Sequence, residues 1–495
     1  MGLALSATAQ NDEALTHQHW FEERTEHFNI YSSGPAQEVA KLGGRLEQFR
    51  DAYGQLAGAQ AVVSPPITVI VFPDLDAMQP YVPLYNGKPA NLAGFFKHGT
   101  EEDIIVLALR GTNDVSLETI FHEYTHSLFR HNDNIWPVWL KEGMAEIYST
   151  FEATGRGVRI GLPIEQHLRL LKGSELMPLS ELLTVNNDSP QYNEADRQGI
   201  FYAESWLLTH FLMNGDNMAF RNRFGSYTTT YLRQGQPPDQ ALVNALGAPL
   251  KSIEAELRRY LERDQFEPLG YVVKIDLSAP RAMTTRPIGW SETCFLLGDE
   301  LMRIGRPDEA ETFFAESQKL SPTSPLAYEG LGLLAAEREK HAAAVQLLKQ
   351  ALERGSASFR AHYVYAEQLL AMSAESKDVY RRVESRTAAE IRSELLRSIK
   401  LMPSFGPAQE LLGFFELVQG DDYASAEQHL RRAIQLEPEQ QYYLIYLAEA
   451  QMRRQDTAGA RRTLEPLTQA HVDAKLRQRA REILSQTNQP ATPAP

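Results

Sequence analysis

Hydrophobic and polar positions follow two different periods in the first part of the chain. Short apolar runs between turn-forming residues predict strands at 27–31, 67–72, 93–97 and 103–109. Between the first two runs, apolar residues recur every three or four positions over 36–57, which predicts a helix with one buried face. Together these elements predict a small mixed sheet with a helix packed on it.

A second helical pattern begins near residue 114. Its apolar stripe, at helical spacing, consists of Leu117, Ile120, Phe121, Tyr124 and Leu128. Asp114 or Ser116 can cap the N-terminus of this helix. From 131 to about 264 the pattern is mainly helical, and 199–213 is strongly apolar.

Beyond residue 290 the chain repeats itself at a period of 34 residues. Gly298 and Gly332 are 34 residues apart, and so are Ala310 and Ala344. Small residues at such positions let the two helices of one repeat pack closely, which is typical of tetratricopeptide repeats. We count about five repeats between 290 and 470, the third irregular because of an insertion around 373–387.

A chain of 495 residues is too long for one ordinary domain. The patterns predict an α+β domain, with a small mixed sheet and a helical lobe, followed by an all-α solenoid of tetratricopeptide repeats. The predicted division is a tail at 1–20, the α+β domain at 21–265, a linker at 266–288, the repeats at 289–486 and a disordered tail at 487–495.

The charge and composition of the chain disfavour some classes of binding partner. The net charge is −15 and no long basic run occurs, which disfavours binding to nucleic acid or to anionic membranes. No stretch of 18 apolar residues exists, so no transmembrane helix is expected. The single cysteine, Cys294, cannot form an intramolecular disulfide and is expected to be a small core residue.

The first ten residues resemble the end of a signal peptide. Ala7-Thr8-Ala9 has the small-x-small form of a signal-peptidase site and follows a short apolar piece. On this interpretation the protein is periplasmic or secreted. The alternative is an ordinary disordered N-terminus on a cytoplasmic protein, because a basic start and most of the apolar segment are missing.

The most informative motif is His122-Glu123-Tyr124-Thr125-His126, an H-E-x-x-H sequence on the second predicted helix. Residues four apart share one helix face, so both imidazoles can bind one zinc ion. Glu123, beside that face, can then accept a proton from a zinc-bound water and deliver it to the leaving amine.

A second motif, W-L-K-E-G-M-A-E at 139–146, follows on the next predicted helix. Its Glu142 offers a third zinc ligand. Glu146, four residues later on the same face, can hydrogen-bond the far nitrogen of a ligand histidine, with a solvated helix charge as the alternative.

These two motifs resemble the gluzincin branch of zinc metallopeptidases, and most closely the bacterial "peptidase MA-like" proteins, in which such a domain precedes tetratricopeptide repeats. The resemblance covers about 20–265, with its specific motifs confined to 122–146. It implies a two-lobed domain with one Zn2+ held by His122, His126 and Glu142. The spacing from His126 to Glu142 is shorter than in thermolysin, and the aminopeptidase motif G-A-M-E-N is absent.

The resemblance also implies a Tyr or His on a helix of the second lobe that stabilises the oxyanion. Tyr202 is the candidate, a packed core tyrosine is its alternative, and His210 is a weaker rival. The strand at 93–97 can pair with a peptide substrate if it lies at the sheet edge, or it is purely structural. The remaining histidines considered are expected at the surface or in loops: His17, His19, His27, His98 and His131.

Three functions compete. The first is a zinc endopeptidase that cleaves a peptide or protein substrate, with repeats that recruit the substrate or a partner protein. The second is a scaffold in which the repeats bind partners and the peptidase domain is vestigial, although the intact H-E-x-x-H motif argues against decay. The third is a zinc hydrolase that acts on bonds other than peptide bonds.

Overall fold

The computed structural model describes residues 19–57, 66–85, 87–90, 92–97, 99, 102–110, 114–129, 136–186, 189–193, 195–214, 221–234, 236–275, 284–376, 379–438, 440–468 and 472–486. The predicted signal-peptide site at 7–9 and the C-terminal tail lie outside these ranges. Trp20, assigned to the N-terminal tail from the sequence, is buried, and its carbonyl accepts a hydrogen bond from the backbone N–H of Ile288. The folded domain therefore already includes Trp20.

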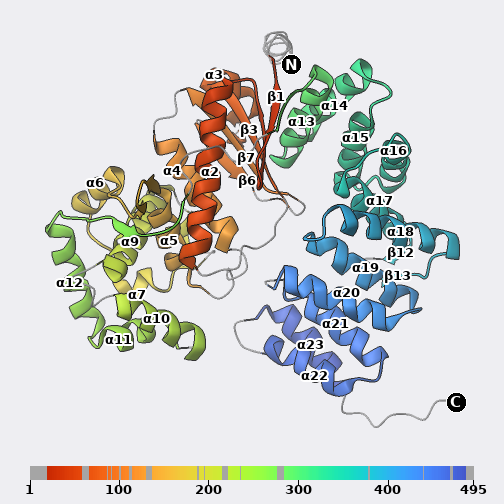
Figure 1. Cartoon of the computed structure of the whole chain (residues 1–495). Coiled ribbons are helices and arrows are strands. Elements are labelled where there is room, and N and C mark those ends of the chain that lie inside the picture. Colours follow the sequence, from red (N-terminus) through yellow and green to blue (C-terminus); the bar gives the residue numbers. More distant parts are fainter. Residues whose placement is uncertain are drawn as a thin grey trace.

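Six strands of the described chain form one sheet in the order β11-β1-β2-β3-β7-β6 (Figure 1). They are β1 (Phe21–Arg24), β2 (Phe28–Ser32), β3 (Ile67–Asp74), β6 (Gly94–Lys97), β7 (Ile104–Arg110) and β11 (Thr284–Pro287). β2, β3 and β7 are parallel, whereas β6 pairs antiparallel with β7 and forms one edge. The four predicted strands are confirmed, with small shifts at their ends.

Both faces of the central strands are buried. Val69 and Val71 of β3 pack into the core beneath α2 (Ala36–Ala57) and α4 (Asp114–Phe129). Ile70 and Phe72 point to the opposite face, because side chains alternate along a strand. A strand that is buried on both faces has a continuous apolar sequence, as 67–72 does.

The first tetratricopeptide repeat covers that opposite face. Its helices are α13 (Trp290–Arg303) and α14 (Pro307–Leu320). Leu297, Leu301 and Phe314 share one buried cluster with Ile70 and Phe72. The guanidinium of Arg306, between the two helices, donates to the carbonyl of Val82 at 3.0 Å. The first repeat and the sheet therefore share one hydrophobic core.

The segment 266–288, predicted as a linker, is tied to the α+β domain at both ends. Strand β10 (Leu269–Tyr271) pairs with β9 (Gly157–Ile160), and β11 pairs with β1. Between them, the backbone of Lys274 makes two hydrogen bonds with the side chain of Gln55, at 3.0 and 3.1 Å. The linker prediction is wrong for these parts, because short pairing segments in a Pro- and Gly-containing stretch leave no periodic signal.

The helical lobe follows α4. Its helices are α5 (Val138–Ser149), α6 (Glu165–Gly173), α7 (Leu179–Leu182), α8 (Pro190–Asn193), α9 (Ala195–Asn214), α10 (Arg221–Gln234), α11 (Pro238–Leu246) and α12 (Leu250–Glu262). A sheet that the sequence did not predict is formed by β8 (Glu152–Thr154), β9 (Gly157–Ile160) and β10. Short elements that follow β3 in the chain are α3 (Leu75–Met78), η1 (Gln79–Tyr81), β4 (Leu84–Tyr85) and β5 (Lys88–Pro89).

The repeats form a curved row of helices from the sheet to the C-terminus (Figure 1). After the first pair come α15 (Pro325–Glu337), α16 (His341–Glu353), α17 (Phe359–Ala371), α18 (Ser385–Leu401), α19 (Gly406–Gln419), α20 (Tyr423–Leu436), α21 (Tyr443–Arg453), α22 (Thr457–Leu464), η3 (Glu465–Thr468) and α23 (Ala474–Gln486). The predicted insertion in the third repeat holds a hairpin of β12 (Ala374–Ser376) and β13 (Val379–Tyr380). Cys294 is buried in α13, as expected. None of the described helices has the length and hydrophobicity needed to cross a membrane.

A close helix contact positions α5 against α9. A side chain at Gly143 would overlap the hydroxyl of Thr209 and the backbone carbonyl of Ser205. Only glycine therefore lets the two backbones approach this closely. Gly143 lies beside Glu142 in the sequence, so this contact also determines where α5 presents that carboxylate.

We expect Gly143→Ala to destabilise the α+β domain by about 1–3 kcal/mol, because the added methyl group must push α5 away from α9. Thermal unfolding followed by circular dichroism measures the effect. Gly155→Ala is the matched control, since a Cβ at Gly155 meets nothing within 4 Å. An unchanged melting temperature for Gly143→Ala would contradict the contact.

His210, the weaker candidate for an oxyanion donor, is a core histidine of α9. Its Nε2 lies 3.0 Å from the carbonyl oxygen of Gly161 and therefore donates, and its Nδ1 accepts from the hydroxyl of Tyr260 at 2.7 Å. Both ring nitrogens are engaged, so the prediction that it stabilises an oxyanion is wrong. Burial lowers the pKa of His210 to about 4.

This pKa predicts an acid-sensitive domain. His210 titrates near 6.5 when unfolded and near 4 when folded, so its contribution to stability is complete above pH 6.5 and is lost as the pH falls toward 4. We expect His210→Gln to reduce the difference in unfolding free energy between pH 7 and pH 4.5 by about 2–3 kcal/mol. Urea unfolding at both pH values measures this. The control is His19→Gln at an exposed position, and identical pH profiles for wild type and His210→Gln would refute the assignment.

Candidate metal centre

Helices α4 and α5 bring the three predicted ligand residues together. The Nε2 atoms of His122 and His126 are 3.2 Å apart. The Oε2 atom of Glu142 lies 3.3 Å from the first and 3.1 Å from the second. These are the residues among those described whose donor atoms converge as a group able to hold a metal ion.

The triangle of donor atoms has the size that a tetrahedral zinc ion requires. Ligand atoms about 2.0–2.1 Å from such an ion lie about 3.3–3.4 Å from one another. The observed separations of 3.1–3.3 Å are close to that value. Two imidazole nitrogens and one carboxylate oxygen are also ligands that zinc prefers, with the fourth position left open. The residues present therefore fit one zinc ion.

Buried apolar residues of α4 and a proline before α5 fix the two helices that carry the ligand residues. Ile120, Phe121 and Tyr124 of the predicted stripe are fully buried and fix the rotation of α4. Phe121 stacks on Phe49 of α2, with ring centroids 4.5 Å apart. Pro137 precedes the first turn of α5, where the missing N–H costs nothing. With both helices anchored, the largely buried imidazoles of His122 and His126 turn toward Glu142.

A second carboxylate supports His122 from behind. Oε1 of Glu146 lies 3.4 Å from Nδ1 of His122. This position is the one that the predicted role of Glu146 requires, since a ligand imidazole is commonly oriented by a carboxylate at its other nitrogen. The other oxygen of Glu146 lies 3.2 Å from Nε2 of His167 on α6.

Sequence reasoning missed His167. It belongs to an amphipathic helix whose sequence, E-Q-H-L-R-L-L, carries no ligand spacing relative to 122–146. His167 reaches the site only because α6 packs against α9, with the imidazole 6.3 Å from the ring of Trp206. Together Glu146 and His167 extend the polar network from His122 into the helical lobe.

The site is strongly charged. Burial by itself disfavours the protonated form of His122, but the carboxylates of Glu146, Glu142 and Glu123 outweigh it and raise its pKa to about 9. Burial likewise opposes ionisation of Glu142, yet hydrogen bonds from the two imidazoles hold its pKa well below the usual range. Three carboxylates around two imidazoles make a site that favours a cation.

Glu123 and Tyr202 lie at the site without belonging to the ligand triangle. Glu123 follows His122 on α4, is partly exposed, and its charge acts on the His122 imidazole. The ring of Tyr202 on α9 packs edge-on against that of His122, with centroids 5.9 Å apart. Tyr202 is half-buried, so the helix of the second lobe does form a wall beside the first ligand.

The remaining sequence predictions concern the strand at 93–97 and the other histidines. Strand β6 is the sheet edge that was predicted at 93–97, and Gly94 approaches Ile120 of α4. His19 is exposed, whereas His27 is partly buried and pairs with Glu47 at 2.7 Å. His17, His98 and His131 lie outside the described residues.

Comparison with family models supports the repeats directly. Residues 295–370 and 417–487 match models described as "Tetratricopeptide repeat". Residues 116–230, which contain every residue of the candidate centre, match a model described as "Protein of unknown function (DUF1570)". That description assigns no chemistry to the centre. No curated protein matches the chain.

Solved structures with similar folds are repeat proteins. YrrB, "a TPR protein with an unusual peptide-binding site", is 14% identical, with 38% of this chain and 90% of that chain covered and a TM-score of 0.32. A thermophilic TPR protein from Thermus thermophilus is 23% identical, with coverage of 39% and 99% and a TM-score of 0.30. PilW, a "widely conserved type IV pilus biogenesis factor", is 17% identical, with coverage of 40% and 90% and a TM-score of 0.32. The family-model matches, and not these structures, identify the helices that follow the α+β domain as tetratricopeptide repeats, a class of repeat associated with protein partners.

Proposed function

We propose that the α+β domain is a zinc-dependent hydrolase of peptide bonds and that the repeats recruit its substrate or a partner protein. The convergence of His122, His126 and Glu142 at zinc-like separations carries this proposal. Buried imidazoles and a carboxylate rarely meet this closely without a cation, because an uncompensated buried charge is costly. The gluzincin resemblance of the same motifs supports the proposal.

Each residue has a defined part in such a reaction. His122, His126 and Glu142 would hold the ion, and Glu146 would keep the His122 imidazole in place through its Nδ1. A bound zinc ion would polarise the substrate carbonyl and lower the pKa of water at its open position. Glu123 would accept the proton of the attacking water on its carboxylate and pass it to the leaving nitrogen.

Peptides are the substrate class that the surroundings favour. Strand β6 forms a sheet edge next to α4, and an edge strand can hydrogen-bond an extended peptide. Tyr202, whose ring packs edge-on against that of His122, would donate its hydroxyl to the oxygen of the substrate carbonyl as charge develops there. A zinc hydrolase acting on other bonds would use the same residues, whereas strand β6 and the gluzincin resemblance favour a peptide.

The alternative is a scaffold with a vestigial hydrolase domain. The matched repeats favour it, since repeats of this class commonly act by binding proteins. The retention of Glu123 beside an intact ligand triangle argues against it, because neither the base nor a ligand is lost. Measuring the zinc content of the purified protein separates the two functions.

We expect the purified protein to bind one zinc ion and to cleave an unfolded protein such as casein. Glu123→Gln should lower cleavage by at least about 10²-fold and leave zinc content unchanged, because it removes the base and no ligand. Glu142→Gln should lose zinc. Metal analysis and a fluorogenic cleavage assay measure both effects.

The control for these variants is Glu175→Gln, which makes the same change at an exposed position of the same domain. Wild-type protein without stoichiometric zinc would leave the scaffold as the better function. Full cleavage by Glu123→Gln would overturn the assigned base.

We expect Tyr202→Phe to lower kcat by about 10²-fold with little change in KM and zinc content, because the lost hydroxyl acts on the transition state more than on the bound substrate. Tyr231→Phe removes a hydroxyl from another half-buried tyrosine of the same lobe and is the matched control. A wild-type kcat for Tyr202→Phe would show that Tyr202 only packs against His122.

A further inference from the structure

The last repeats share one groove. Side chains from α17, α19, α21 and α23 line a space of about 710 Å³. We define this C-terminal groove by Tyr363, Glu367, Glu410, Phe414, Tyr442 and Tyr446. Its four helices come from successive repeats and contact one another in order, so the groove runs across the repeats.

Aromatic rings form one wall of the C-terminal groove. The ring of Tyr446 lies 4.9 Å from that of Phe414 and 6.0 Å from that of Tyr442, measured between centroids. Tyr442 remains 39% exposed, although large aromatic side chains are usually covered. Exposed aromatic faces attract organic cations, because the ring face carries partial negative charge.

The charges that line the same groove are mainly negative. They are the carboxylates of Glu367, Glu410 and Glu449 and the guanidinium of Arg479. Arg479 is already paired with Glu449, at 2.6 Å. Among the described residues, Glu410 has neither a hydrogen bond nor an ion pair in this structure. The groove therefore combines a surplus of carboxylates with aromatic faces.

The carboxyl of Glu410 is held in an unfavourable environment. Burial raises its pKa, and the neighbouring carboxylates of Glu367 and Glu437 add to the effect, so the pKa is about 8. A cation bound next to it would restore the ionised form. The groove is also lined by Tyr442, at the N-terminus of α21, and by the Glu449–Arg479 pair of α21 and α23, which bring no free positive charge.

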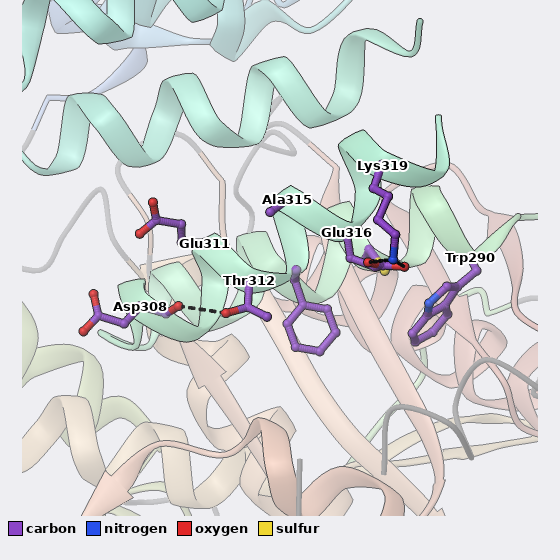
Figure 2. A pocket seen from close by; sticks show the side chains of 9 residues that line it. Trp290, Asp308, Glu311, Thr312, Ala315, Glu316 and Lys319 are labelled. Carbon is purple, nitrogen blue, oxygen red and sulfur yellow. Dashed lines mark hydrogen bonds and ion pairs between the residues drawn. The ribbon is translucent and has the colours of Figure 1, made fainter. Parts of the chain in front are cut away.

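A second pocket offers a comparison, because its acidic side chains are paired with cationic side chains. It measures about 600 Å³ and lies on α13 and α14, between Trp290 and Asp308 (Figure 2). Its acidic residues have cationic partners: Asp308 and Glu311 pair with Arg338, and Glu316 pairs with Lys319 at 3.1 Å. Figure 2 shows Glu316 and Lys319 pointing at one another. No comparable partner of Glu410 exists among the described residues.

We propose that the C-terminal groove binds an extended segment of a partner protein through an arginine or lysine side chain. The cation lies against Tyr442 and Tyr446 and pairs with Glu410 and Glu367. Apolar residues of the segment cover the remaining aromatic surface. This inference depends on the proposed partner-binding role of the repeats and is independent of the hydrolase activity.

The size of the groove indicates the length of the segment. Packed helices lie about 8–10 Å apart, so the three steps from α17 to α23 span about 24–30 Å. An extended chain covers about 3.3 Å per residue, which corresponds to roughly eight residues. A peptide of about nine residues is therefore a sufficient probe.

The test uses the full-length protein and fluorescein-labelled peptides of about nine residues with glycine, leucine and two arginines. The matched probe replaces each arginine by citrulline, its neutral isostere. Binding is measured by fluorescence anisotropy on Glu123→Gln protein, so that no peptide is cleaved. We expect the arginine peptide to bind at least about tenfold more tightly, because only it carries the cation.

The double variant Glu367→Gln/Glu410→Gln should reduce this preference to less than about threefold and leave the affinity for the citrulline peptide unchanged. Its control removes two exposed carboxylates outside the groove, in Glu262→Gln/Glu337→Gln, and should keep the preference. In otherwise unaltered Glu123→Gln protein, the preference should also fall as ionic strength rises.

Two results would overturn the inference. One is equal affinity for the arginine and citrulline peptides at low ionic strength. The other is an unchanged preference in the double variant, with folding verified by circular dichroism. Neither result bears on zinc content or cleavage, so failure of this inference is distinguishable from failure of the proposed hydrolase.

Discussion

The contact between α5 and α9 at Gly143 is the constraint on which the candidate metal centre depends. On one side of α5, Glu142 meets the two imidazoles of α4 within 3.1–3.3 Å. The next residue, Gly143, closely approaches the backbone of α9 at Ser205, about one turn after Tyr202. A metal site tolerates errors of only about 0.2 Å in its ligand distances. A wider separation of α5 from α9 would therefore change the ligand triangle and the wall beside it at the same time. The glycine of the E-G-M-A-E segment thus acts through packing, whereas its two glutamates direct carboxylates at the imidazoles of the candidate metal centre.

The sheet links this centre to the repeats. One face of β3 and β7 packs on α2 and α4, which positions the histidines, and the other face packs on α13 and α14. Leu297, Leu301 and Phe314 are buried against the sheet. Separating the first repeat from the sheet would therefore expose a large apolar surface. Strand β11 and the Lys274–Gln55 hydrogen bonds attach the connecting segment at both ends. The repeats are therefore a continuation of the domain core, and whatever they bind is held in a defined relation to the α+β domain.

The sequence predicted features that depend on local pattern and missed those that depend on packing partners. The strands, α2, α4 and the repeats each have their own period, and the H-E-x-x-H spacing places two imidazoles on one helix face whatever surrounds them. The run at 67–72 predicted a buried strand, but no periodicity states which element covers its second face. The short strands of 266–288 have three or four residues each and acquire their structure from β9 and β1. His167 has no spacing relation to His122, because Glu146 joins them across three helices. His210 illustrates the opposite case, since a histidine on a suitable helix turned out to be engaged by Gly161 and Tyr260 in the core.

The same physical imbalance, too many carboxylates for the cations present, occurs at two places in this chain, and the available space decides what can relieve it. At the candidate metal centre the donor atoms are 3.1–3.3 Å apart. That leaves room for a bare ion and excludes any organic group. In the C-terminal groove, about 710 Å³ lies between the carboxylates and a wall of aromatic rings. A bare ion would leave those rings exposed, whereas a guanidinium or ammonium on an apolar stem would cover them. The first place therefore favours an inorganic cation and the second an organic one, and the two can be occupied independently. On the proposed function, a partner held by a basic segment in the C-terminal groove would present another part of itself to the candidate metal centre, which would explain why both sites occur in one chain.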